Sequence, residues 1–167
     1  MSDYQSLLEY KDIIIDIRKI VRSINLESKR ILKDFGISIP QLLCLSYLEK
    51  QDRYQSTHKE LTEYLNLNSS TVTGIINRLE KKGYIARLPK QGDKRITYLT
   101  LTSSGAKVLD KTPDLLHEKL SRSLAKLSLG EVQQLKKSLA ILIAALEIQE
   151  VDASPLLVIE EPISPEE

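Results

Sequence analysis

Side chains that can donate hydrogen bonds recur on one side of a predicted helix between Ser69 and Lys81. Its buried side is predicted from apolar residues at helical spacing, namely Val72, Ile75, Ile76 and Leu79. The opposite side carries small hydroxyl and amide groups and a basic end, namely Ser70, Thr73, Gly74, Asn77 and Lys81. Because that side has no carboxylate, it suits the base edges and phosphates of DNA. The alternative is an ordinary solvated face, and the flanking segments favour DNA binding.

A further group of basic residues follows in a turn-rich segment, residues 89–95. Strand-like sequence flanks it at residues 84–88 and 96–101, which predicts a β-hairpin. The tip of this hairpin carries three basic residues, Lys90, Lys94 and Arg95. From residue 57 to residue 100, eight basic residues stand against four acidic residues, a net charge of +4. Positive charge on the helix and the hairpin tip is what neutralisation of DNA phosphates requires.

Local signals define the ends of the helices that would present these residues. Thr57 and Glu60 form a capping-box pattern that begins one helix, and Asn68 is a good N-cap for the next. Gly83 is the expected C-terminal stop of that second helix. Two short helices joined by a tight turn and followed by a hairpin predict a winged helix-turn-helix. The predicted fold class is therefore mainly α with a small β-hairpin wing.

Three motifs in this region point to a family. They are L-E-x-K-G-x-(I/V)-x-R at residues 79–87, D-x-R at residues 93–95, and L-T-x-x-G at residues 101–105. The chain here resembles the multiple-antibiotic-resistance regulator (MarR) family of bacterial and archaeal transcription factors. The resemblance is dense over about fifty residues and extends more loosely to residue 148, which is far more specific than a lone helix-turn-helix pattern.

The resemblance implies DNA contacts from the second helix and the wing. The residues expected to make them are Asn68, Ser69, Ser70, Thr71, Thr73, Gly74, Asn77, Arg78, Lys81, Lys90, Lys94 and Arg95. Arg95 is implied to reach into the minor groove. Asp93 is either the residue that orients it through a charge-assisted hydrogen bond or simple turn chemistry beside Gly92. Many members have a basic residue where this chain has Gly74, so its sequence preference is not copied from theirs.

The helices on either side of this region carry an apolar surface wide enough to need burial on more than one side. A long helix is expected from Leu7 to Phe35, with Ile13 and Ile17 on its apolar surface. A capping box, Ser128 with Glu131, begins a helix near the C-terminus. The apolar residues of that helix follow the spacing of a helix–helix seam, namely Val132, Leu135, Leu139, Leu142 and Leu146.

We expect the long first helix and this seam to form a homodimer, because the resemblance implies that the terminal helices of two subunits interdigitate. A helix from Thr102 to Leu127, bent near Pro113, would connect the wing to the seam. The alternative is a three-helix core within one chain.

Cys44 lies on a supporting helix, Ile39 to Lys50, which begins at a capping box of Ser38 and Gln41. A small buried thiol is the preferred interpretation and a redox sensor the alternative. Peroxide-sensing relatives place their reactive cysteine in the first helix, where this chain has none. With His58 and His117 the chain offers no recognisable zinc-ligand cluster, and both histidines are interpreted as exposed.

The charge is divided unevenly along the chain. From Glu147 to the end there are seven acidic residues and no basic one, a net charge of −7, whereas residues 1–146 carry +8. We expect one unit over residues 1–148, with the DNA-binding lobe at 36–101 and dimerisation helices at 1–35 and 102–148. Residues 149–167 are expected to be an acidic, flexible tail. That tail is a solvated extension, docks on another surface, or competes with DNA for the basic face.

Together these features predict a homodimeric, cytoplasmic, nucleoid-associated regulator that binds a pseudo-palindromic operator in double-stranded DNA, as a repressor. The competing interpretation is a winged-helix protein-interaction module without DNA binding. No enzyme motif, metal site or cofactor is predicted. No apolar run approaches the roughly 20 residues that span a bilayer, so no membrane association is expected. A small phenolic or anionic effector is implied by the resemblance, in a cleft that Tyr10 and Tyr47 are candidates to line.

Overall fold

The computed structural model describes the backbone of residues 2–88 and 97–151, and side chains from residue 10 onward within those ranges. The elements in chain order are α1 (Ser2–Phe35), α2 (Ile39–Glu49), a 3-10 turn η1 (Asp52–Tyr54), β1 (Gln55–Thr57), α3 (His58–Leu65), α4 (Ser69–Lys81), β2 (Ile85–Arg87), β3 (Tyr98–Leu101), α5 (Ser103–Lys111), α6 (Leu116–Leu124) and α7 (Leu129–Ala145). The predicted wing-tip residues Lys90, Asp93, Lys94 and Arg95 and the tail from residue 152 lie outside the described residues.

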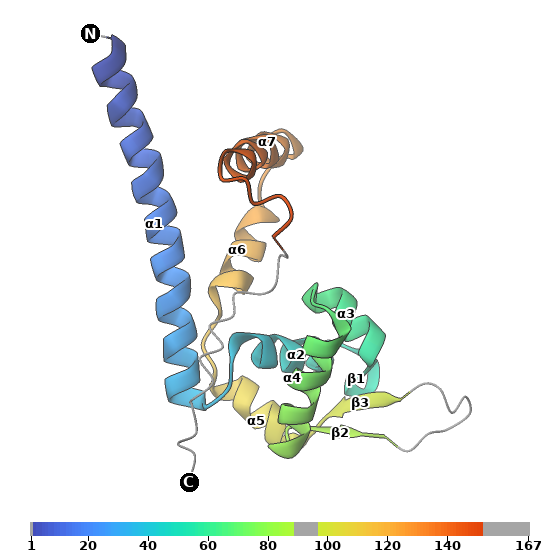
Figure 1. The fold of residues 1–167 in the computed structure, drawn as a ribbon. Helices are drawn as coiled ribbons and strands as arrows, with labels where there is room; N and C mark the ends of the chain where they lie inside the picture. The colour runs from blue at the N-terminus through green and yellow to red at the C-terminus, as the bar shows by residue number, and fades with distance from the viewer. Residues whose placement is uncertain (1, 89–96, 152–167) are drawn as a thin grey trace.

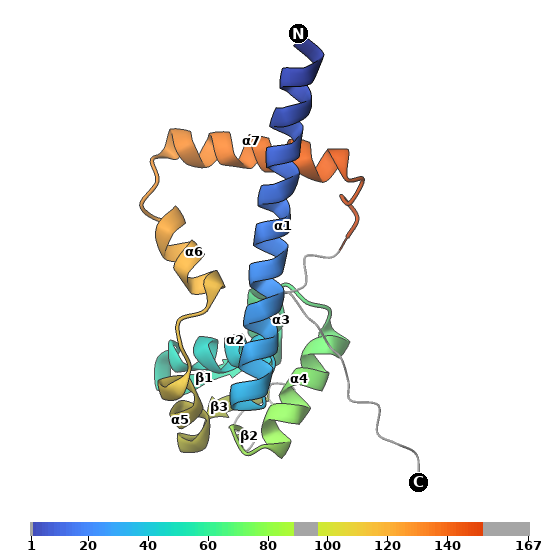
Figure 2. The ribbon, with the colours of Figure 1, turned by 90° about the vertical axis from the view of Figure 1, so that its left-hand side faces the viewer.

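A lobe built around α2 carries the helix-turn-helix, and two groups of helices extend from it. In Figure 1, α1 leaves the lobe as a long rod, and the β2–β3 hairpin points away from α1 on the opposite side. α6 leads from the lobe toward α7, which runs across the direction of α1 (Figure 2). The mainly helical fold class with a small sheet is confirmed.

The sheet has three antiparallel strands in the order β1-β3-β2. Ser56 pairs with Leu99, and Arg87 pairs with Leu99 from the other side, so β3 is the central strand. The hairpin of β2 and β3 was predicted, but β1 was not. Its three residues, Gln-Ser-Thr, are too few and too polar to show a strand pattern, and they pair only because β3 has a free edge beside the start of α3.

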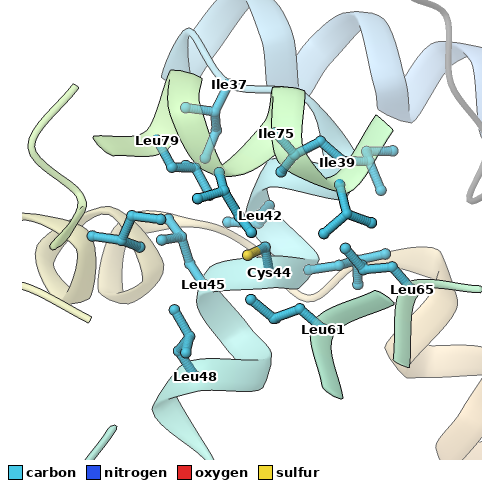
Figure 3. Close-up of a cluster of buried hydrophobic side chains, with 14 of the residues drawn as sticks. Ile37, Ile39, Leu42, Cys44, Leu45, Leu48, Leu61, Leu65, Ile75 and Leu79 are labelled. Carbon is cyan, nitrogen blue, oxygen red and sulfur yellow. The ribbon is translucent and has the colours of Figure 1, made fainter. Parts of the chain in front are cut away.

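The hydrophobic core surrounds α2, which is buried on nearly all sides. Its buried residues are Ile39, Pro40, Gln41, Leu42, Leu43, Cys44, Leu45, Ser46 and Leu48. Residues from α3 and α4 pack on it, among them Leu61, Leu65, Ile75 and Leu79 (Figure 3). α5 and β3 also pack against α2. A helix that is apolar all round belongs at the centre of a lobe, where it fixes its neighbours in place.

The helix starts predicted from capping boxes are confirmed, whereas α1 begins at Ser2, five residues before the predicted Leu7. Glu60 Oε2 accepts a hydrogen bond from Thr57 N at 2.8 Å, and Glu131 Oε2 accepts one from Ser128 N, also at 2.8 Å. Gln41 Oε1 accepts from Ser38 N at 3.0 Å. At the turn between α3 and α4, Asn66 adopts the left-handed conformation with φ 51°.

The connection from the wing to α7 consists of two helices where one bent helix was predicted. Thr112, the residue before Pro113, is extended with φ −85° and ψ 132°. A proline disfavours helical conformation in the residue before it, so α5 ends instead of bending. α6 then begins at Leu116, whose backbone N–H donates to Glu27 Oε1 of α1 at 2.7 Å. A carboxylate from α1 therefore caps the N-terminus of α6.

Much apolar surface on α1 and α7 has no cover within the protomer. On α1, Ile13 is 47% exposed and Ile20 is 61% exposed, and among its side chains described from residue 10 onward Ile31 is the one apolar side chain that is buried. No residue of α7 is buried, and Leu139 is 48% exposed. In the part of the chain that the structure describes, α1 and α7 therefore do not form the intrachain three-helix core that was the alternative.

Within residues 2–88 and 97–151, no single helix combines the length and the apolarity needed to cross a bilayer. One pair, Tyr10–Phe35 with Ile39–Glu49, meets the length and composition requirement together across a bend of 75°.

Candidate nucleic-acid interface

α4 has the two faces that its spacing predicts. Val72, Ile75, Ile76 and Leu79 are buried in the core. Most of the predicted contact residues are exposed, namely Asn68, Ser69, Ser70, Thr73, Asn77, Arg78 and Lys81. Thr71 and Gly74 are half-buried. The structure thus brings the predicted residues of this helix together on one surface, away from the core.

The N-terminus of α4 is organised by Asn68. Its Oδ1 accepts from the backbone N–H of Thr71 at 2.8 Å and from the hydroxyl of Ser70 at 2.7 Å. The N-cap side chain is therefore occupied within the helix. Ser69 and Ser70 occupy the first turn, where unpaired backbone N–H groups and the positive end of the helix dipole favour a phosphate.

Thr73 is held from two directions. Its hydroxyl lies 2.9 Å from the carbonyl oxygen of Ser69, one turn earlier in α4. It also lies 2.9 Å from Nε2 of His58, the first residue of α3. His58 was expected to be exposed and is half-buried, with its Nε2 in contact with α4 across the helix-turn-helix.

Asn77 is held by Arg87, a residue that the sequence reasoning did not place in the site. Arg87 Nη2 donates to Asn77 Oδ1 at 2.8 Å, and Arg87 Nε donates to Glu80 Oε2 at 2.9 Å. Since a guanidinium only donates, Asn77 must turn its oxygen to Arg87 and its amide N–H groups elsewhere. Glu80, the one carboxylate in α4, is neutralised by the same guanidinium. The sequence did contain a signal for Arg87, because this arginine is the last residue of the family motif at residues 79–87.

The remaining basic groups near α4 differ in how they are engaged. Arg78 Nε reaches back to the carbonyl of Gly74 at 3.3 Å. Lys82 Nζ donates to the carbonyl oxygen of Gly36, at the end of α1, and so lies toward the dimerisation helices. Lys59 forms an ion pair with Glu63 at 3.8 Å on the exposed side of α3. Among the described residues, cationic side chains border α4, as phosphate contact requires.

The base of the wing is regular as far as the structure describes it. Leu88 N donates to Tyr98 O at 2.9 Å, next to the pairing of β2 with β3. This places Leu88 and Tyr98, which flank the tip segment, side by side at the end of the described hairpin. The predicted contacts of Lys90, Lys94 and Arg95, and the orienting role of Asp93, belong to the tip itself and stay predictions.

Cys44 is fully buried, as predicted, and burial raises the pKa of its thiol to about 12. A thiol in that state is not a nucleophile at neutral pH. Among residues 10–88 and 97–151, no cluster of histidine, cysteine and carboxylate side chains is arranged to hold a metal ion.

The two tyrosines proposed to line an effector cleft are in different environments. Tyr47 stacks on Tyr64 with ring centroids 4.3 Å apart, and burial raises the pKa of Tyr64. Tyr10 is 61% exposed on α1. A groove of about 450 Å³ instead follows α1 and is lined by Ile17, Arg18, Val21, Arg22, Asn25, Leu26 and Lys29. Its lining mixes apolar and cationic side chains.

Comparison with known proteins identifies relatives among transcriptional regulators. The sequence profile of the MarR family matches residues 37–97. The organic hydroperoxide resistance transcriptional regulator of Bacillus subtilis is 32% identical over 125 residues, covering 75% of this chain and 82% of that protein. The transcriptional repressor MprA of Escherichia coli is 30% identical, covering 74% of this chain and 70% of MprA.

The solved structures agree in fold. The MepR–DNA complex of S. aureus matches with a TM-score of 0.58 and 25% identity, covering 77% of this chain and 94% of MepR. The chain belongs to the MarR family of winged helix-turn-helix proteins, and it is a DNA-binding transcriptional regulator, not an enzyme.

Proposed function

We propose that this protein represses transcription as a homodimer that places one α4 helix in each of two successive major grooves of a pseudo-palindromic operator. The observation that carries this proposal is the exposed face of α4. It presents hydroxyl, amide and basic groups, and its single carboxylate, Glu80, is paired with Arg87. Such a face approaches DNA without electrostatic penalty.

The dimer follows from the uncovered apolar surface of the terminal helices. α1 exposes Ile13, and the seam exposes Leu135 of α7 and Leu146, the residue that caps the end of α7. Exposed apolar surface of this extent indicates an interface. A twofold dimer also presents two α4 helices, which must lie about 34 Å apart to meet successive turns of DNA.

The repressor assignment is supported by the similarity to MprA, a transcriptional repressor. Operator binding near a promoter then blocks transcription by occupancy, and the protein acts in the cytoplasm on nucleoid DNA. A small anionic effector is the proposed release signal. The groove along α1 supports it, because Arg18, Arg22 and Lys29 border apolar side chains there.

The test is a salt titration of binding to duplex DNA, with the duplex taken from a binding-site selection on the full chain. Affinity should fall steeply as salt rises, because phosphate contacts release counterions. Thr73→Ala and Asn77→Ala should each change the selected base pairs, at a cost of about 1 to 3 kcal/mol per lost base contact. Ser121→Ala, on the exposed surface of α6, is the matched control.

Failure of the full chain to bind any duplex would favour the protein-interaction module. Binding without any selected motif would remove the sequence-specific part of the proposal. Selection of one and the same motif by both variants and the wild type would remove Thr73 and Asn77 as base-reading residues.

A further inference from the structure

The contact between His58 and Thr73 joins the two helices of the helix-turn-helix at the DNA-facing surface. α3 and α4 pack against each other, and His58 is the first residue of α3 (Figure 1). Its Nε2 lies 2.9 Å from Thr73 Oγ1, on the face of α4 that is exposed. A residue outside the recognition helix therefore controls a side chain that points to DNA.

The position of the hydroxyl proton of Thr73 decides what this threonine offers to a base. Thr73 Oγ1 lies 2.9 Å from the carbonyl oxygen of Ser69, which can only accept. The single proton of Thr73 is therefore directed to Ser69. Toward His58, Thr73 then has only lone pairs, so His58 must donate from Nε2–H.

The other side of the ring lies against Thr62. Thr62 Oγ1 donates to the carbonyl oxygen of His58 at 2.8 Å and lies 3.3 Å from His58 Nδ1. The proton of Thr62 is thus also directed to a carbonyl. Thr62 therefore adds no hydrogen bond to Nδ1, and the hydrogen bond from Nε2 to Thr73 orients the ring.

We propose that His58 is a positioning residue that makes Thr73 read DNA as a hydrogen-bond acceptor. Threonine populates two χ1 rotamers in helices, and the bonds to Ser69 and His58 together hold one of them. Thr73 then presents a remaining lone pair and its methyl group to the groove. It can accept from the exocyclic amine of adenine or cytosine or contact the thymine methyl group, but it has no proton for the acceptors of guanine.

This inference rests on the proposed base-reading role of α4 and makes it specific. It assigns to His58 the choice among base pairs at one position of each half-site. Removing the imidazole leaves Ser69 as the one described partner that holds this rotamer, so Thr73 can also adopt its other rotamer, in which the hydroxyl leaves Ser69 and can donate to guanine. A glutamine at residue 58 keeps an N–H donor on a side chain of similar reach.

The experiment uses the full chain and the duplex selected by the wild type. Dissociation constants are measured for that duplex and for each of its single base-pair variants. His58→Ala, His58→Gln, Thr73→Ala and the double variant of His58→Ala with Thr73→Ala are compared. His117→Ala, the other histidine of the chain, is the matched control because it lies exposed on α6.

His58→Ala should reduce discrimination at the base pair read by Thr73 by about three- to tenfold, the ratio that one hydrogen bond supplies. Discrimination at the other base pairs should stay within about twofold, since their contacts are unchanged. His58→Gln should restore most of the loss. In the Thr73→Ala background, His58→Ala should have no further effect on discrimination.

Two results would overturn the inference. Equal weakening of all duplexes by His58→Ala would show a general structural role, and thermal unfolding of each variant reports that directly. A motif that changes with Thr73→Ala but not with His58→Ala would remove His58 and leave the function of α4 standing. If Thr73→Ala itself selects the wild-type motif, the base-reading role of Thr73 fails first, and the role of His58 fails with it.

Discussion

Gly105 lies where the chain enters α5, directly against the carbonyl oxygen of Tyr84. The backbone around it is tied to the turn after α4, because Thr102 Oγ1 donates to Gly83 O at 2.7 Å and accepts from Gly105 N at 3.1 Å. A methyl group at Gly105 would collide with the oxygen of Tyr84 and would lie 2.7 Å from Leu101 Cδ1. The glycine of the L-T-x-x-G motif is thus required by close packing of α5 on the end of α4.

Gly105→Ala should therefore lower the free energy of unfolding by about 1 to 3 kcal/mol, the usual cost of overpacking. Chemical denaturation of the full chain measures it. Gly130→Ala is the control, since a methyl group there meets nothing within 4 Å and alanine favours a helix. A Gly105→Ala protein as stable as the wild type would contradict the packing argument.

Cys44 should be unreactive in the native protein. Its side chain is fully buried, and a pKa of about 12 leaves almost no thiolate at pH 8. A chromogenic disulfide reagent should label the thiol in guanidinium chloride but leave the native chain unlabelled over minutes. Rapid labelling of the native protein, or loss of DNA affinity on mild oxidation, would instead support the sensor alternative.

Sequence reasoning found the side chains of the recognition surface but not the residues that hold them. Thr73 and Asn77 stand out because helical spacing separates them from the apolar residues of α4. His58 and Arg87 contact them from α3 and β2. Such contacts depend on how two elements pack against each other. The spacing of residues within one element does not predict that packing.

At the scale of the element, the start of α3 depends on one ionised carboxylate. Glu60 accepts from Thr57 N and from the hydroxyls of Ser56 and Thr57. These hydrogen bonds, led by the one from the Thr57 backbone, hold the pKa of Glu60 below its usual range. A lowered folded-state pKa contributes stability that is present above the unfolded pKa and is lost as pH falls through the folded pKa.

The stability difference between the wild type and Glu60→Gln should therefore shrink as pH is lowered from 6 through about 4, the usual range of a glutamate, and below. Glutamine keeps an acceptor for the capping box but does not titrate in this range. Denaturant midpoints at each pH measure the difference. Glu63→Gln, one turn further along α3, controls for loss of charge, and a constant difference down to pH 3 would exclude linkage to Glu60.

The elements that were predicted well are those with a local cause. Ser38, Thr57 and Ser128 each begin a helix through a capping pattern four residues long, which can be read directly in the sequence. β1 was missed because its three residues are ordered by β3, more than forty positions later. The break between α5 and α6 was expected as a bend because the helical spacing continues across Pro113, while the extended Thr112 ends the helix.

At the scale of the whole molecule, the lobe has a buried core of its own, whereas α1 and α7 leave apolar side chains exposed. Leu139→Glu with Leu142→Glu places two charges on the proposed seam, where burial without a partner is costly. The chain should then sediment as a monomer and lose most operator affinity, because one α4 helix cannot span two grooves. Gln133→Glu with Ala140→Glu adds the same charge on the other side of α7. An intact dimer in the seam variant would contradict the assignment of this surface.

The absence of any buried residue in α7 also has a kinetic consequence. Backbone hydrogen bonds of a helix open readily where no packing opposes fraying, whereas those of α2 open only when the lobe unfolds. If α7 is covered by a second subunit, its amide hydrogens exchange with solvent at a rate set by protein concentration, while those of α2 do not. The ratio of the amide exchange rate of α7 to that of α2 then reports the fraction of the protein that is dimeric.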